Sequence, residues 1–100
     1  MNYVHYFEPL ALKEYVDALK WYKQRSDAAS INFVKEMDVA IKVICSDPQK
    51  FRTTYKQFRE TALKKYPFYI IYSIDESRKQ VIIFSVFHSK RNPLKKYSKK

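Results

Sequence analysis

Hydrophobic residues in the first half of the chain recur at the three- and four-residue spacing of an α-helix, in two separate stretches. The first stretch covers residues 10–24, and its apolar face is made by Leu12, Tyr15, Leu19 and Tyr22. The second covers residues 28–46, and its stripe is made by Phe33, Val34, Met37, Ile41 and Ile44. This spacing brings the apolar side chains to one side of each helix, so two amphipathic helices are predicted.

The residues at the ends of these stretches support the two helices. Pro9 suits the first turn of a helix, because its missing N–H would have no partner there. Ser26 or Asp27 can cap the second helix with a side-chain oxygen. Pro48 ends the second helix, because the residue before a proline is disfavoured in helical conformation. The connection between the stretches is short, so the two helices are expected to form a hairpin.

The period changes in the rest of the chain and indicates strands. Residues 2–7 (NYVHYF), 66–75 (YPFYIIYSID) and 80–88 (QVIIFSVFH) are rich in β-branched and aromatic side chains. Residues 51–63 (FRTTYKQFRETAL) are β-branched, aromatic and basic, and they are predicted to contain one further strand. The predicted order is therefore β-α-α-β-β-β in a single domain, residues 1–100.

The predicted fold class is α+β, with the helix hairpin packed on one face of a small, mainly antiparallel sheet. The last three strands form a meander, because their connections are too short for crossovers. The strands within 68–75 and 80–88 are apolar on both faces, so the face away from the helices needs a cover as well. We expect a partner on this free face: a second copy, or an acidic or amphipathic segment of another chain. The basic tail, from about residue 92 to 100, is predicted to leave the sheet.

Charge divides the chain into two halves. The net charge is +10, yet residues 1–48 hold six Lys and Arg against seven Asp and Glu, whereas residues 49–100 hold fourteen against three. A basic half of this kind indicates a surface for a polyanion or for an acidic partner. The chain contains no glycine, which excludes the glycine-rich phosphate loops of P-loop and Rossmann nucleotide-binding proteins.

No cofactor and no metal are predicted, and the chain is expected in a reducing cytosol. Cys45 is the single cysteine, so no internal disulfide forms. His5, His88 and Cys45 lie far apart in sequence and do not make a metal-ligand cluster. No apolar run approaches the roughly 18 residues that span a bilayer, and the N-terminus lacks the pattern of a secretion signal.

Candidate chemistry gathers where the last strand ends, in the segment VFHSKRNP (residues 86–93). His88, in phase with Ile82, Phe84 and Val86, can transfer protons near neutral pH. Arg91 and Arg59 can stabilise the charge of a phosphodiester during cleavage, and in a meander Arg59 and His88 can share one surface. The further residues expected to contact a substrate or target are Lys64, Lys65, Lys90 and Tyr97. The competing interpretation is structural: His88 packs at the strand end, and Arg91 bonds a carbonyl or a carboxylate.

Several of these segments resemble the RelE/ParE superfamily of toxins from type II toxin–antitoxin modules, often described as plasmid stabilisation proteins. The resemblance rests mainly on FRETALKKYPFYIIY (residues 58–72) and VFHSKRNP, with KWY near the end of the first helix, and it covers nearly the whole chain. It implies a small cytosolic bacterial toxin, neutralised by an antitoxin whose C-terminal segment wraps around it.

The superfamily divides by target, so the resemblance leaves two mechanisms open. RelE-like members are ribosome-dependent ribonucleases that cut mRNA without a metal, and in that case His88, Arg91 and Arg59 are expected to be catalytic. ParE-like members inhibit DNA gyrase and are not nucleases, and in that case the basic tail and the sheet edge are contact surface. We expect mRNA cleavage, with gyrase inhibition as the alternative; a toxin that has lost its activity and persists as a partner is a third, weaker option.

Overall fold

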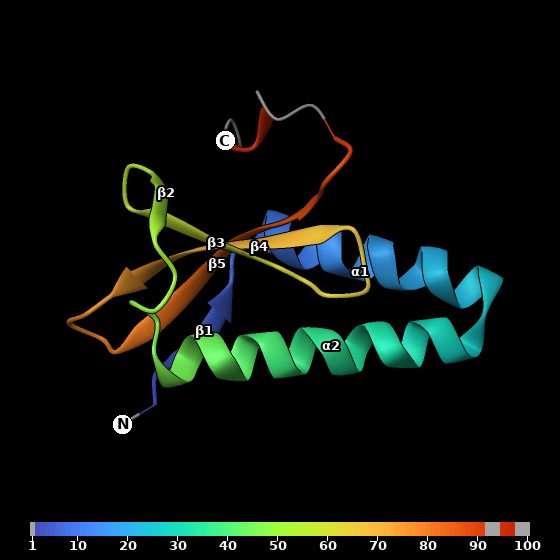
Figure 1. Ribbon diagram of the computed structural model, residues 1–100, viewed down its shortest axis with the longest axis horizontal. Helices are drawn as coiled ribbons and strands as arrows, with labels where there is room; N and C mark the ends of the chain where they lie inside the picture. Colours follow the sequence, from blue (N-terminus) through green and yellow to red (C-terminus); the bar gives the residue numbers. More distant parts are fainter. Residues whose placement is uncertain (1, 92–94, 98–100) are drawn as a thin grey trace.

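The computed structural model describes residues 2–91 and 95–97, which form a helix hairpin on a five-stranded sheet (Figure 1). The elements in chain order are β1 (Val4–Phe7), α1 (Pro9–Arg25), α2 (Asp27–Ser46), β2 (Thr53–Tyr55), β3 (Phe58–Ala62), β4 (Phe68–Asp75) and β5 (Gln80–His88). The strand order is β1-β5-β4-β3-β2, with β1 parallel to β5 and the other neighbours antiparallel. The predicted α+β class, the helix hairpin and the meander are confirmed.

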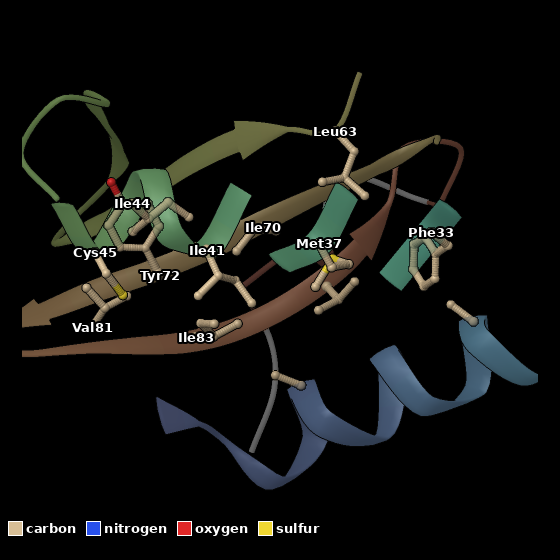
Figure 2. Packing of buried hydrophobic residues seen from close by; sticks show 13 residues of the cluster. Phe33, Met37, Ile41, Ile44, Cys45, Leu63, Ile70, Tyr72, Val81 and Ile83 are labelled. Carbon is tan, nitrogen blue, oxygen red and sulfur yellow. The ribbon is translucent and has the colours of Figure 1, made fainter. Parts of the chain in front are cut away.

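The buried stripe of α2 supplies more residues than any other element to the core between the helices and the sheet (Figure 2). The residues that meet there are Phe33, Met37, Ile41 and Ile44 of α2, Ile70 and Tyr72 of β4, and Val81 and Ile83 of β5. On α1, the buried positions are the small residues Ala11 and Ala18, which let this helix pack over β5. Ser26 caps α2 as predicted, because its Oγ accepts the N–H of Ala29 at 3.1 Å. Within the described residues, neither helix is long and apolar enough to cross a membrane.

The segment 51–63 holds two strands, where its composition predicted one. β2 and β3 form a hairpin that reverses at Lys56 and Gln57, and Lys56 adopts a φ of 50°. Glycine, asparagine or aspartate usually occupies such a left-handed position in a hairpin turn. This chain has no glycine and places a lysine there, so the sequence carries no turn signal and the extra edge strand β2 was missed.

A β-bulge in β5 interrupts the alternation of its side chains. Ile71 of β4 pairs with Ser85, whereas Tyr72, the next residue of β4, pairs with Ile83. Phe84 is therefore an extra residue on β5 with no partner of its own in the β4 register. An extra residue shifts the period-two pattern by one position, so side chains that follow it change faces.

The bulge places His88 on the helix-covered side of the sheet. Val86 is buried in the core under the helices, and His88, two residues on, lies opposite Phe68 of β4. Ile82, before the bulge, and Phe84, the extra residue, lie on the other face, where the ring of Phe84 packs against Phe58 of β3. The prediction that His88 shares a face with Val86 is consistent with the structure, but the prediction that it also shares one with Ile82 and Phe84 is wrong.

The face of the sheet away from the helices is covered in part by the chain's own residues 95–97, which lie across the sheet from α2 (Figure 1). Lys96 Nζ lies 3.1 Å from Oε1 of Glu60 on β3. The ring of Tyr97 stacks on Tyr55 and Phe58, with centroids 4.6 Å and 5.4 Å apart. Ile71 beneath this layer is fully buried.

This cover corrects the prediction that the tail leaves the sheet, and it leaves the face predicted for a partner only partly open. Residues 95–97 fold back, while residues 92–94 and 98–100 of the predicted tail lie outside the described residues. The physical reason is Glu60, one of three acidic residues in the basic half. Its carboxylate accepts hydrogen bonds from Lys96 Nζ and from the hydroxyl of Tyr97, and so holds the tail on the sheet.

Candidate functional site

Glu14 of α1 joins the helix hairpin to the end of β5. Its Oε1 accepts a hydrogen bond from the Ser85 hydroxyl at 2.9 Å and another from the Val86 N–H at 3.0 Å. Its Oε2 accepts from Nη1 of Arg91, also at 2.9 Å. One carboxylate therefore holds the two residues that follow the bulge and also Arg91, three positions after the strand.

The bulge explains why a carboxylate is needed at this place. An extra residue disrupts the ladder locally and turns backbone and side-chain donors away from the neighbouring strand. Ser85 and Val86 are both buried, so their donors need an acceptor from within the protein. Glu14 lies three residues after Ala11 and four before Ala18, close to the buried face of α1. A carboxylate at this position of an amphipathic helix needs partners inside the protein, and this is the signal that the sequence offered.

A cavity of about 470 Å³ lies beside Glu14, between α1 and the ends of β4 and β5. His88 and Arg91, two of the three predicted catalytic residues, both line it. The His88 ring stands edge-on to Phe68, with centroids 5.0 Å apart, and its Nδ1 accepts the N–H of Lys90 at 3.1 Å. The structure therefore brings His88 and Arg91 together, with both engaged in contacts inside the protein.

Arg59, the third predicted catalytic residue, lies elsewhere. It pairs with Tyr72 on β4, whereas His88 pairs with Phe68, four residues along the same strand or roughly 13 Å. Nη1 of Arg59 donates to the carbonyl of Phe51 at 2.6 Å and, more distantly, to that of Gln49 at 3.4 Å. These bonds fasten the loop after α2 to the sheet, so Arg59 and His88 do not share a surface.

Tyr72 of β4 also holds the loop after α2. Its hydroxyl donates to the Pro48 carbonyl at 2.6 Å, and burial raises the pKa of Tyr72 to about 12. An unfolded tyrosine ionises near pH 10, so the folded state holds this proton more tightly than the unfolded state. The stability that results is fully present below about pH 10 and is lost as the pH rises through about 12, by about 2–3 kcal/mol in total.

The change in stability on replacing Tyr72 with phenylalanine is expected to depend on pH. At pH about 9 the variant loses a buried hydrogen bond and is less stable by about 1–2 kcal/mol. At pH about 11.5 the difference disappears or inverts, because phenylalanine has no proton to lose. Urea unfolding at the two pH values measures this. Tyr97, whose pKa is also raised to about 12 by burial and by Glu60, provides the comparison. The Tyr97→Phe variant still contains Tyr72, so its stability should still fall as Tyr72 ionises. A constant deficit for Tyr72→Phe at both pH values would contradict the assignment.

The predicted binding residues are spread over three places. Lys64 and Lys65 lie in the connection between β3 and β4, next to α2, and the Lys65 N–H donates to Oε1 of Glu36 at 2.8 Å. Lys90 is exposed directly after β5. Tyr97 lies on the far face of the sheet, away from His88. Among the described residues, no group of three histidine, cysteine, aspartate or glutamate side chains could hold a metal ion.

Three solved structures share this arrangement of helices and strands. The ParDE toxin–antitoxin system from Pseudomonas aeruginosa matches with a TM-score of 0.73 at 11% identity, over 88% of this chain and 97% of that one. The RelBE2 toxin–antitoxin complex from Mycobacterium tuberculosis matches with 0.60 at 13%, over 88% and 99%. The isolated RelE toxin of Escherichia coli matches with 0.57 at 16%, over 96% and 94%. At these identities the likeness establishes the fold, which is RelE/ParE-like.

The sequence itself settles the family within this fold. The model of the family described as ParE toxin of type II toxin–antitoxin system, parDE, matches residues 6–93. This is most of the chain, so the protein belongs to the ParE toxin family of the RelE/ParE superfamily. No curated protein is similar enough in sequence to count as a match. A cognate antitoxin is implied, because the family and two of the similar structures belong to toxin–antitoxin systems.

Proposed function

We propose that this toxin stops growth by binding DNA gyrase, as ParE-like members of the superfamily are expected to do, and that it does not cut mRNA. The observation that carries the proposal is how the two candidate arginines are used. Arg91 pairs with the carboxylate of Glu14, and Arg59 donates to main-chain carbonyls of the loop after α2. A phosphodiester beside His88 would meet a carboxylate together with the guanidinium, which weakens electrostatic stabilisation of the transition state.

A second candidate function, ribosome-dependent mRNA cleavage, is supported by one observation. His88 and Arg91 line the same cavity, so a proton-transfer group and a cation are near each other. For this mechanism Arg91 would have to leave Glu14 and bind the phosphate. Another cation would have to take the role predicted for Arg59, which lies away from His88. Gyrase binding asks for no such rearrangement and is the function that the geometry and the family favour.

The two mechanisms are separated by parallel assays on the purified toxin. We expect the protein to block supercoiling of relaxed plasmid by gyrase and to leave the 5′ ends of mRNA unchanged in a translating extract. His88→Ala should keep most of the inhibition, because His88 contacts neighbours within the protein. Circular dichroism of the variant confirms that it is folded. Cleavage within codons that is lost in folded His88→Ala, with supercoiling intact, would establish the ribonuclease instead.

We also propose that the antitoxin neutralises this toxin in the cytoplasm with an acidic or amphipathic segment. Fourteen Lys and Arg against three Asp and Glu in residues 49–100 support such a partner. The far sheet face, where the sequence placed this segment, is covered in part by residues 95–97.

A further inference from the structure

Among the described residues, the sheet has two edge strands, and they differ in how far they resist pairing with another chain. An edge strand presents main-chain donors and acceptors, and proteins limit their pairing with charges, proline, irregular register or short strands. β2 has three residues and an irregular register, and Arg52 and Lys56 flank it. β1 keeps a regular register with β5 and reads VHYF, without lysine, arginine or proline. β1 is therefore the edge that remains open to a further strand.

His5 and Phe7 turn their main-chain groups toward the outside of the sheet. The N–H groups of Val4 and Glu8 donate inward, to carbonyls of the residue before β5 and of β5 itself. Successive residues of a strand point their N–H and C=O groups in opposite directions, so those of His5 and Phe7 face away from β5. Positions 5 and 7 together therefore offer two donors and two acceptors along the outer side of β1.

The side chains of β1 leave this edge accessible from both faces of the sheet. The ring of Phe7 stacks on Tyr15 of α1, so Phe7 and His5, two residues before it, lie on the helix side. His5 is nevertheless exposed. Val4 and Tyr6 lie on the far side and are 68% and 47% exposed. Exposure on both faces leaves room for a strand beside β1, and the exposed pair on the far side is apolar.

Charge allows a second copy of this chain to approach at β1, although the net charge is +10. The excess of Lys and Arg lies in residues 49–100, and among residues 2–8 only Glu8 carries a formal charge. The cation beside the start of β1 is Lys79, whose Nζ lies over the ring of Tyr3 and 3.7 Å from Oε1 of Glu76. Repulsion between two copies is therefore smaller at this edge than at a contact made through the basic half.

We propose that two copies of this chain pair their β1 strands antiparallel, about a twofold axis that passes between the two Tyr6 residues. In this register His5 of each copy lies opposite Phe7 of the other, so the outward N–H and C=O groups of both residues gain partners. An axis at His5 would instead pair Phe7 with Tyr3, whose N–H already donates to the carbonyl of Cys45. The axis at Tyr6 is thus the register that satisfies the outward groups of β1 within β1 itself.

The side chains match in the same register. The two Tyr6 rings meet across the axis, where the strands approach closely, and aromatic cross-strand pairs are stabilising. Glu8 of one copy comes opposite Val4 of the other, whose N–H bonds the carbonyl of Lys79, so opposite charges approach each other. This strand is therefore its own complement, which is why the occupant is a second copy.

The contact is small, because four residues of each strand take part, so the dimer is weak and depends on concentration. Neither gyrase nor the antitoxin is involved, and the pairing goes beyond the proposed function.

Amide hydrogen exchange, measured by NMR on the full chain, tests the register. Between about 10 µM and about 1 mM toxin, exchange at His5 and Phe7 should slow about fourfold, because a dissociation constant of about 100 µM lowers the free fraction by this factor. Exchange at Tyr6 should not change, since its N–H faces β5 at both concentrations. Sedimentation over the same range should approach twice the mass of one chain.

A cysteine at the axis tests the pairing in a second way. Tyr6→Cys, made in a Cys45→Ala background, should form a disulfide-linked dimer in a mild redox buffer, because residues opposed at such a position have Cα atoms about 4.5 Å apart. Ile31→Cys in the same background is the matched control, since Ile31 is 55% exposed near the start of α2. Tyr6→Lys should abolish the dimer by setting two lysines against each other, and Ile31→Lys should keep it. Circular dichroism shows whether each variant is folded.

Each outcome decides the proposal. Slower exchange at His5 and Phe7, with crosslinking at position 6 and loss of the dimer in Tyr6→Lys, supports it. A chain that stays monomeric at about 1 mM, equal crosslinking at positions 6 and 31, or equal losses in the two lysine variants would overturn it. Protection of His5 and Phe7 that appears only when antitoxin is added would also overturn it, because the edge would then belong to that partner. Gyrase is absent from these experiments, so failure here is distinct from failure of the gyrase proposal.

Discussion

Replacing Glu14 with alanine is expected to lower the free energy of unfolding by about 3–4 kcal/mol, measured by urea denaturation. The substitution leaves the Ser85 hydroxyl and the Val86 N–H without their acceptor, and each such buried donor costs about 1–3 kcal/mol. The ion pair with Arg91 adds little, because the Arg91 side chain is 45% exposed and water screens the charge. The effect is therefore one of buried hydrogen bonding far more than of charge.

Two comparisons test this explanation of the Glu14 effect. Asp17→Ala removes a carboxylate three residues away whose described ion pair is an exposed one with Lys13, and it should cost less than about 1 kcal/mol. Glu14→Gln keeps an acceptor for Ser85 and Val86, so it should recover most of the loss. If Glu14→Gln is as unstable as Glu14→Ala, the ion pair with Arg91 dominates and the argument from buried donors fails.

Replacing Phe33 with alanine is expected to be the most destabilising change in the core, at about 3–5 kcal/mol. Phe33 is fully buried, and its ring contacts the aromatic rings of four neighbours. These neighbours are Tyr15, Tyr22, Tyr66 and Phe68, with ring centroids 5.1–5.7 Å from that of Phe33. They come from α1, the β3–β4 connection and β4, so one cavity weakens contacts between three parts of the fold.

The size of the cavity, and not the loss of aromatic character alone, should decide this cost. Phe33→Leu fills most of the space and is expected to lose about half as much as alanine. Ile31→Ala, two residues earlier on the same helix and 55% exposed, should change stability by less than about 0.5 kcal/mol. Urea midpoints of the three variants measure the series. Equal losses for Phe33→Ala and Ile31→Ala would show that helix propensity, and not packing, governs this position.

The elements that the sequence predicted well are those whose apolar pattern is strong and local. Both helices, β4 and β5 were found near their observed bounds, since burial of one stripe or of two faces leaves a regular record in the sequence. β2 was missed because it is three exposed residues at a turn without glycine. The bulge at Phe84 was missed because β5 carries apolar residues at both alternate sets of positions, so a shift of one position barely changes the pattern.

The candidate site was predicted only in part, for a different reason. His88 and Arg91 lie close in sequence, so their meeting in one cavity follows from local geometry. Glu14 reaches Arg91 across 77 positions, and Glu60 reaches Tyr97 across 37. The periodicity of apolar residues along the chain cannot indicate contacts between residues so far apart. One signal for Glu60 was the scarcity of acidic residues in residues 49–100. In a strongly basic segment each carboxylate has many possible cationic partners, so an ion pair at Glu60 could have been expected.

The parallel pairing of β1 with β5 has a consequence for how the toxin is made. Val4 pairs with Gln80 and Phe7 with Ile83, so β1 can join the sheet only after residues 80–83 have been synthesised. The hydrogen bonds of Glu14 likewise cannot form before Ser85, Val86 and Arg91 have been synthesised. Contacts this distant in sequence form slowly, and none of them can form before the later partner has been synthesised. A nascent chain therefore has no finished toxin surface until residues 80–91 have left the ribosome and paired with the first strand and with α1.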